Sequence, residues 1–266
     1  MDIKEIQKAL LEDYIVVSNI CKAHNLKLFL TGGSVLGAVR HNGFIPWDDD
    51  MDLALPREQY EEFINNYSKE LPDYLNVIIK VRNRYAAIID NRYKVSFRKE
   101  AAAFVDGENE YLSMDLQALD GTPNNAIFRF LHSTNVMINR VCYKMCDSSY
   151  IYLDNWRKPW ERILIRMLKR FEYLFNKPEK YCKRWEESMC KYPYEHSDII
   201  ADYMGKYKYK DIYPKDWWEP GIMHNFEGIG VLIPSKYDKY LSQIYGEYMK
   251  IPTDEEKYIH IDLNEK

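Results

Sequence analysis

The sequence predicts a mixed α/β (α+β) fold, in which a mixed sheet is flanked by helices and carries a long helical insertion. Within residues 1–123, short apolar runs that fit strands alternate with amphipathic patterns that fit helices. Residues 124–210 are mostly helical in pattern, and residues 211–266 return to a hairpin pattern followed by a helix. We therefore expect a core at 1–123, an aromatic and basic insertion at 124–210, and a C-terminal segment at 211–266 that completes the core.

The composition is typical of a folded protein. The chain has 266 residues, of which 46% are hydrophobic, so it can bury a sizeable core. Five cysteines without paired zinc spacing indicate reduced thiols in the core. The sequence contains neither a signal-peptide pattern nor an apolar run of about 18 residues. We expect a cytoplasmic protein, with peripheral contact at the inner membrane face as an additional hypothesis. The acidic overall charge and the lack of a known motif argue against a nucleic-acid partner.

The core elements follow from periodicity and from turn residues. In the first half we expect a helix at 2–24, a strand at 26–30, a glycine turn at 31–34, a short helix at 35–40 capped by Ser34, a strand at 50–55 and a helix at 57–67. In the second half we expect strands at 77–81, 86–97 and 111–119, and a closing turn at 120–123. Pro159, Pro178 and Pro193 should interrupt the insertion, because proline removes a backbone donor and disfavours helix interiors.

The stretch GFIPWDDDMDLALP, residues 43–56, concentrates four carboxylates before an apolar run. Side chains two apart on a strand share a face, so Asp50 and Asp52 should converge on one point. Asp115, in the predicted strand at 111–119, is a natural third member. Carboxylate oxygens are the ligands that Mg²⁺ prefers, and a bound cation would offset the repulsion among these groups. The alternative is a solvated acidic turn.

The glycine turn at residues 31–34 points to the same chemistry. Gly32, Gly33 and Ser34 should present backbone N–H groups at a helix N-terminus, an arrangement that favours anions. A phosphate beside this turn and a metal beside the carboxylates would form a phosphoryl-transfer site.

The block LFLTGGSVLGAVRHNGFIPWDDDMDLALPREQYEEF resembles the LicD family, whose members have a nucleotidyltransferase fold and include fukutin and fukutin-related protein. The blocks MDLQALDGTP, residues 114–123, and FEGIGVLIPSKYDKYLSQIYGEYMKIP, residues 226–252, continue the resemblance. It covers both ends of the chain, and only the helical middle is weakly matched.

The resemblance implies a Mg²⁺-dependent transferase that uses one or two ions, with Mn²⁺ as an alternative. It would move phosphocholine, or a similar phospho-alcohol, from CDP-choline or another CDP-alcohol to a glycan hydroxyl. The acceptor would be a cell-surface glycan, such as lipopolysaccharide, teichoic acid or capsule, or its lipid-linked precursor. By the same comparison Asp48, Asp50, Asp52 and Asp115 match metal-binding positions, and Asp50, Asp52 and Asp115 are the expected catalytic residues. Whether Asp115 acts as base, as ligand or as both stays open.

Five other residues are weaker candidates for donor binding. Arg40 and His41 follow the short helix and can reach a diphosphate. Arg92 and Lys94 alternate on one predicted strand and have a solvated face as their alternative explanation. Glu227, beside Phe226, is a candidate for sensing a choline cation, with simple core stacking as the alternative.

Two rival functions remain open at this stage. One is nucleotidyl transfer to a small molecule, and the other is a non-catalytic glycan-binding protein of the same fold. The segment at 156–175 interleaves apolar side chains with Arg162, Arg166, Lys169 and Arg170. It predicts either an ordinary amphipathic helix or contact with an anionic membrane.

Overall fold

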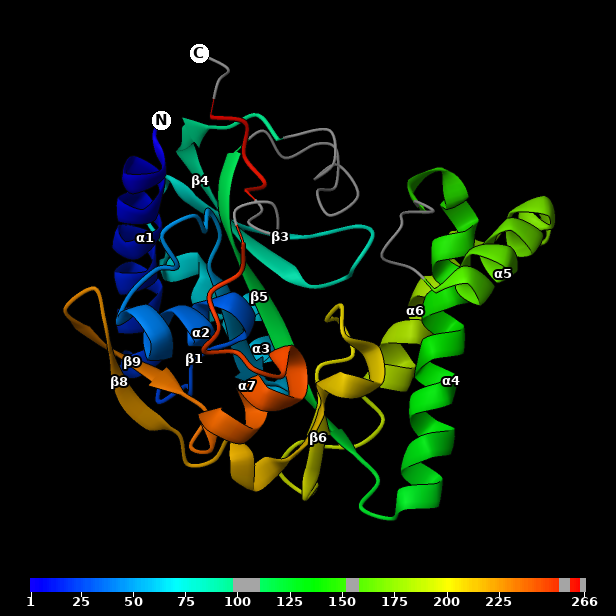
Figure 1. Cartoon of the computed structure of the whole chain (residues 1–266). Coiled ribbons are helices and arrows are strands. Elements are labelled where there is room, and N and C mark those ends of the chain that lie inside the picture. Colours follow the sequence, from blue (N-terminus) through cyan, green and yellow to red (C-terminus); the bar gives the residue numbers. More distant parts are fainter. Residues whose placement is uncertain (98–110, 152–157, 254–258, 264–266) are drawn as a thin grey trace.

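A mixed sheet with helices on both sides forms the core of the molecule (Figure 1). The computed structural model describes residues 1–97, 111–151, 158–253 and 259–263. The described strands form one nine-stranded sheet with the order β3-β4-β5-β2-β1-β9-β8, and β6 and β7 are attached through β5. Their bounds are β1 Phe29–Leu30, β2 Asp52–Pro56, β3 Leu75–Ile79, β4 Ala86–Lys94, β5 Tyr111–Thr122, β6 Ile199–Ala201, β7 Ile212–Pro214, β8 Ile222–Phe226 and β9 Ile229–Ile233. The predicted mixed α/β class is confirmed.

Seven α-helices surround this sheet in the described residues. They are α1 Ile3–Ala23, α2 Gly32–His41, α3 Arg57–Asn65, α4 Ala126–Lys144, α5 Pro159–Arg170, α6 Pro178–Met189 and α7 Tyr237–Tyr245. In Figure 1, α4, α5 and α6 are grouped to the right of the sheet, and α5 projects away from the body. None of the helices in the described ranges is both long and apolar enough to cross a membrane.

The first helix illustrates how the apolar pattern builds the core. Asp2 caps α1 by accepting from the backbone N–H groups of Lys4 and Glu5. Apolar side chains that recur at helical spacing are then buried against the sheet, with Ile6, Leu10 and Val17 fully inaccessible. The predicted helix at 2–24 is therefore confirmed to within a residue at each end.

Several predicted boundaries were wrong. The strand expected at 26–30 is only Phe29–Leu30. The turn expected at 120–123 is strand through Thr122, because β5 continues beyond the core and pairs with β6 in the antiparallel register Asp120↔Ala201. Since β6 is only three residues long and lies inside the helical insertion, its pattern was too short to recognise.

Two prolines of the insertion begin helices rather than break them. Pro159 and Pro178 are the first residues of α5 and α6, where the missing N–H would have no helical partner. The hairpin and helix expected at the C-terminal end are present as β8, β9 and α7. Because β9 pairs in parallel with β1, the C-terminal part adds two strands to the core sheet.

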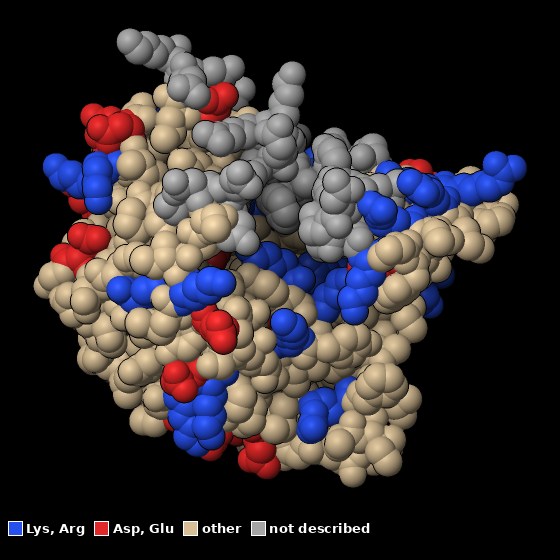
Figure 2. Space-filling view, in the orientation of Figure 1, with Lys and Arg blue, Asp and Glu red and all other residues tan. Residues whose placement is uncertain are grey.

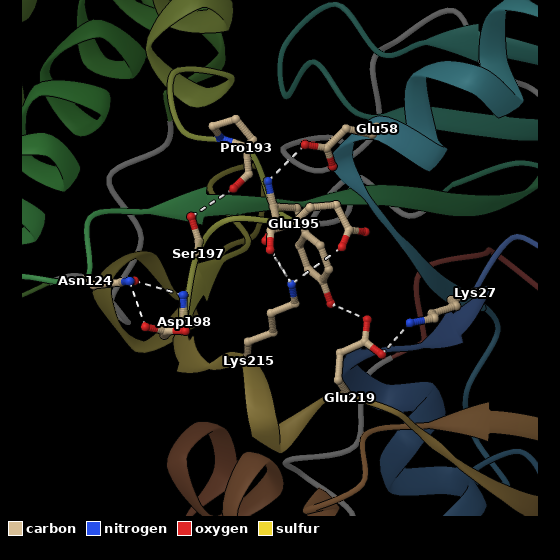
Figure 3. Close-up of polar contacts among 10 residues, drawn as sticks. Lys27, Glu58, Asn124, Pro193, Glu195, Ser197, Asp198, Lys215 and Glu219 are labelled. Carbon is tan, nitrogen blue, oxygen red and sulfur yellow. Dashed lines mark hydrogen bonds and ion pairs between the residues drawn. The ribbon is translucent and has the colours of Figure 1, made fainter.

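Polar contacts tie the end of the insertion to the core (Figure 3). Glu219 accepts from Lys27 at 2.6 Å and from the hydroxyl of Tyr194 at 3.0 Å. The backbone N–H of Tyr194 donates to Glu58 in α3 at 2.9 Å. A shallow surface hollow beside Lys215 lies at these contacts, none of the predicted site residues lines it, and we assign it no chemistry.

The cysteines are all free thiols, as predicted. Only Cys21 is buried, and Cys190 is exposed, so the expectation that all five lie in the core was wrong.

Candidate active site

The acidic residues meet where β2 begins beside β5. These strands run in parallel, and their register places Asp52 directly opposite Asp115. The backbone N–H of Asp115 also donates to the carbonyl of Met51 at 3.0 Å, which fixes this register at the strand entrance. The predicted pairing of the DMD motif with the strand at 111–119 is therefore present in the sheet. Asp50 itself precedes β2, and its side chain is 40% exposed.

The glycine turn lies against the same carboxylates. Gly32 has φ +52°, and a Cβ atom there would be 2.7 Å from Oδ2 of Asp52. A Cβ at Gly33 would be 3.2 Å from Oδ2 of Asp48. Only glycine lets the chain turn this closely past the acidic residues. The turn and the DDDMD stretch, separated in sequence, thus form one surface.

Ser34 has a different local role from the predicted helix cap. The helix α2 begins earlier, at Gly32, with Thr31 at the N-cap position. The hydroxyl of Ser34 instead accepts from the backbone N–H of Asp52 at 2.9 Å. The amide of Gly32 donates to the hydroxyl of Tyr240 at 2.8 Å, so one N–H of the predicted anion site is already engaged. Anion binding at this turn stays a prediction.

Asp49 faces inward and anchors the C-terminal segment. It is 3% exposed and accepts from the backbone N–H of Ile261. His260 lies 2.9 Å from Asp49 and 3.7 Å from Asp50. Residues 49 and 260, more than two hundred positions apart, are thus joined at the acidic cluster. His260 was left out of the predicted site because a lone histidine is more often structural, and nothing near it in the sequence indicates this contact.

Two lysines supply further positive charge. Nζ of Lys80 lies 2.6 Å from Oδ1 of Asp115, and Lys80 is only 7% exposed. Lys206 is close enough to Asp50 and Asp52 for its positive charge to offset part of the rise in the pKa values of both carboxyl groups. In Figure 2, Lys and Arg side chains gather between the sheet core and the helical insertion. Neither lysine was predicted, because each comes from a segment without a local motif.

The carboxylates interact strongly with one another. The pKa of Asp52 is raised to about 8 by burial and by the charges of Asp50 and Asp115, which together outweigh the opposite effect of Lys206 and His260. Burial also raises the pKa of Asp48 well above its ordinary value, with Asp50 and Asp52 adding to the effect. Burial disfavours the charged form of His260 and so lowers its pKa. The hydrogen bond to Asp49 and the negative charge of Asp50 outweigh this effect, so that the pKa of His260 is raised. The cluster therefore has more negative charge than its own cations balance.

These residues fit a divalent cation that is bound by only one or two protein side chains. Across residues 1–97, 111–151, 158–253 and 259–263, no three Asp, Glu, His or Cys side chains are arranged to hold a metal ion. Mg²⁺ is commonly bound by one or two carboxylates, with water and phosphate completing its shell. Asp50 and Asp52, whose like charges repel each other, fit that pattern. Asp115 is engaged by Lys80, so it is the less available ligand.

Arg40 and His41 lie at the end of α2. The guanidinium of Arg40 donates to His41 at 2.9 Å and to the carbonyl of Tyr248 at 2.9 Å. The charge of Asp48 acts on Arg40, which places the guanidinium near the acidic cluster. Arg40 thus connects the cluster to the chain after α7, and its role toward a diphosphate stays a prediction.

Arg92 and Lys94 have partners of their own. Arg92 donates to Asp90 and to Asp13, at 2.6 and 2.9 Å, and its guanidinium lies 3.8 Å from the ring centre of Tyr74. The ammonium of Lys94 lies 5.8 Å from the ring centre of Tyr111. Arg92 therefore fixes α1 to β4 and to the residue before β3. These contacts give Arg92 a structural role, which is neither of the two alternatives drawn from the sequence, donor binding or a solvated face, and donor binding stays a prediction.

Glu227 holds the loop before the acidic stretch. Its carboxylate accepts from the backbone N–H of Phe44 at 3.1 Å, and its own N–H donates to the carbonyl of Asn42 at 2.9 Å. A Cβ at Gly43 would be 2.0 Å from this carboxylate, which explains the glycine. Phe226 is fully buried against Phe44. The contacts assign Glu227 to positioning the loop, whereas recognition of choline stays a prediction.

Comparison with known proteins agrees with this geometry. The model of the LicD/FKTN/FKRP nucleotidyltransferase domain matches residues 25–163, which is 139 of the 266 residues and includes the glycine turn, the acidic stretch and β5. This chain belongs to the LicD family. The predicted family membership is thereby confirmed.

This LicD-family chain is similar to two kinds of named transferase. It is 27% identical to the lipopolysaccharide cholinephosphotransferase LicD of Haemophilus influenzae over 251 residues, which cover 91% of this chain and 89% of that protein. It is 44% identical to the ribitol 5-phosphate transferase FKRP of Homo sapiens and of Mus musculus over 48 residues, covering 18% of this chain and 10% of each relative. The relatives therefore differ in the alcohol that their names specify.

Proposed function

We propose that this LicD-family protein transfers a phospho-alcohol, with phosphocholine as the first candidate, from a CDP-linked donor to a hydroxyl of a cell-surface glycan or its lipid-linked precursor. The observation that carries the proposal is the register of Asp52 opposite Asp115, with Asp50 and the glycine turn beside them. Similarity along nearly the whole length of a cholinephosphotransferase supports phosphocholine as the candidate group.

The reaction would exchange one P–O bond for another. The acceptor oxygen attacks the phosphorus that carries the alcohol, the bond from that phosphorus to CMP breaks, and CMP leaves. Asp115 is the candidate to take the hydroxyl proton, and Lys80, whose Nζ lies 2.6 Å from Oδ1 of Asp115, would hold that carboxyl group in position. Lys206 and His260 provide positive charge for the donor's diphosphate.

Asp50 and Asp52 would hold Mg²⁺, or Mn²⁺ in its place, with Asp48 beside them. The metal ion would neutralise the diphosphate and stabilise CMP as a leaving group. The chain's own residues would orient the reactants, because the glycine turn lies directly against Asp52 and Asp48 and Arg40 lies at the edge of the cluster near Asp48.

Donor selectivity tests the proposal directly. The protein would be incubated with Mg²⁺ and with CDP-choline, CDP-ribitol, CDP-glycerol or ATP, together with a cell-wall or lipopolysaccharide glycan fraction. CMP release that requires both one CDP-alcohol and the acceptor supports the proposal. Pyrophosphate release from ATP alone would instead indicate nucleotidyl transfer. Donor binding without turnover of any substrate would indicate a non-catalytic protein.

A further inference from the structure

The helical insertion exposes an unusual amount of apolar surface. Among the described residues, 13 of the 21 exposed large hydrophobic side chains lie within residues 127–174. Single exposed apolar side chains are ordinary, but a concentration of them on one part of a protein marks a contact surface. The core sheet and the acidic cluster do not use these side chains.

Helix α4 presents an apolar stripe outward. Ile127, Leu131, Ile138 and Val141 recur at helical spacing and are all exposed, Ile127 by 70%. The buried residues of the same helix, His132, Ser133 and Val136, lie on its other side. Packing within the molecule therefore accounts for only one side of α4.

Helix α5 is exposed on one side and only partly covered on the other. It has no buried residue, and its apolar side chains Trp160, Ile163, Leu164 and Met167 continue in Phe171 just beyond its end. Their spacing places them along one face, and Trp160, Ile163 and Met167 are each exposed by 58% or 59%. An isolated amphipathic helix of 12 residues gains little from its own hydrogen bonds, so a partner surface is the expected source of its stability.

Charge identifies the kind of partner. Residues 124–185 contain 13 Lys and Arg against 5 Asp and Glu, a net charge of +8, in a chain whose net charge is −4. On α5, Arg166 and Arg170 flank the apolar face, and Lys158 precedes the helix. Figure 2 shows blue side chains along the upper edge of this projection and tan surface below it.

We propose that the apolar faces of α4 and α5, with the basic residues beside them, seat the protein on an anionic lipid bilayer. An amphipathic helix with Lys and Arg on its polar face and Trp, Phe and Leu on the other lies in the plane of the membrane interface. Helix α5 is about 18 Å long at 1.5 Å per residue, too short to span a bilayer, so it lies flat. Trp160 and Tyr173 belong to the residue types that favour the headgroup level.

A second copy of the chain is a less suitable occupant. Two copies that met through these faces would bring two strongly positive segments together, with a repulsion that an anionic surface avoids. The proposal does not rest on the proposed transferase activity, because the surface is separate from the acidic cluster.

The test is co-sedimentation of the full chain with vesicles of phosphatidylcholine alone or mixed with phosphatidylglycerol, at low and high salt. A basic variant carries Lys158→Gln, Arg166→Gln and Arg170→Gln. An apolar variant carries Trp160→Ser, Ile163→Ser and Met167→Ser. All six side chains are exposed, so both variants should fold, which circular dichroism and thermal unfolding would verify.

Matched controls alter the same chemistry elsewhere. Lys4→Gln, Lys8→Gln and Lys69→Gln remove the same charge from exposed positions outside the insertion. Met223→Ser, Met249→Ser and Ile251→Ser remove exposed apolar side chains outside it. We expect wild type and both controls to bind anionic vesicles at low salt, and both insertion variants to bind at least about tenfold more weakly.

Three results would overturn the proposal. They are failure of wild type to prefer anionic vesicles at low salt, equal binding by either insertion variant, and equal loss of binding in the matched controls. Light scattering adds a fourth: a wild-type dimer that becomes monomeric in the apolar variant, without vesicle binding, would identify the surface as an interface between copies.

Discussion

Asp52 lies where the constraints on the candidate site converge. It faces Asp115 across two parallel strands, donates from its backbone N–H to the hydroxyl of Ser34, and leaves no room for a Cβ at Gly32. A charged carboxylate in this position repels its acidic neighbours. Its presence therefore costs stability, and a functional role explains why the site keeps it.

Asp52→Asn should separate function from stability. We expect transferase activity to fall by about 100-fold or more, because the substitution removes a charge that would hold the metal ion. The free energy of unfolding without divalent metal should stay equal or rise by about 1 kcal/mol, because the substitution removes a carboxyl group whose ionisation is opposed by burial and by its acidic neighbours. CMP release and chemical denaturation in EDTA measure the two effects. Asp73→Asn, at an exposed position, is the control that should change neither. Full activity of Asp52→Asn would remove Asp52 from the site.

Lys80 and Asp115 should behave as a coupled pair. Lys80→Met leaves the partly buried Asp115 carboxylate without its 2.6 Å partner, and we expect a loss of about 2 kcal/mol in the free energy of unfolding. Asp115→Asn in the Lys80→Met background should then cost less than Asp115→Asn alone. Denaturant unfolding of the four proteins of this double-mutant cycle gives the coupling. Strictly additive effects would show that the pair does not contribute to stability.

At the scale of elements, the start of α3 is joined to the end of β5. Arg57, the first residue of α3, donates from Nε to Oδ1 of Asp120 at 2.7 Å and from its terminal nitrogen to Oδ2 at 3.0 Å. Asp120 is fully buried at the point where β5 leaves the core and pairs with β6. This fork therefore anchors both α3 and the short sheet extension to the strand that carries Asp115.

Arg57→Met should destabilise the fold by about 3–5 kcal/mol, because it leaves the Asp120 carboxylate buried without a cation. Arg57→Lys should recover only part of the loss, since an ammonium cannot form the two-point contact. Denaturant unfolding checks both values. Lys69→Met, at an exposed position, is a matched loss of positive charge and should stay close to wild type. Equal stability of Arg57→Met and wild type would contradict the anchoring role.

At the scale of the whole molecule, aromatic contacts hold α4 against the later part of the helical insertion. His132 of α4 is 6% exposed and packs edge-on against Tyr192 and Tyr203. Within the part of the chain that the structure describes, its Nε2 atom has no hydrogen-bond partner. Burial and, to a smaller extent, the charge of Lys191 together lower the pKa of His132 to about 4. This packing of α4 therefore requires a neutral imidazole.

Stability should consequently fall in acid. The unfolded chain takes up this proton near pH 6.5, whereas the folded chain takes it up only near pH 4, so stability is complete above about 6.5 and is lost as the pH falls toward 4. We expect His132→Phe to reduce this loss by about 1–2 kcal/mol, a value discounted for partial solvent screening. Thermal unfolding of both proteins between pH 4 and pH 7.5 measures the difference. An exposed histidine variant, His196→Phe, serves as the control. Parallel pH profiles of His132→Phe and wild type would contradict the role of His132.

The sequence by itself determined the family, the fold class and the local chemistry of the acidic stretch. Apolar periodicity identified α1, β2 and α7, because burial of one face imposes that period directly on the residues. The DMD motif and the glycine turn were recognisable because their residue types are required within a few positions of each other.

Only the tertiary structure decided which distant residues complete the cluster. Lys80, Lys206 and His260 reach the carboxylates through strand pairing and chain return, which leave no local pattern. The same holds for the three-residue strand β6, whose position depends on the free edge of β5. It also holds for Arg92, which contacts Asp13 and Asp90 because the fold brings α1 beside β4. Ionic and hydrogen-bond partners far apart in sequence depend on the folded geometry, whereas a helix or a turn depends mainly on its own residues.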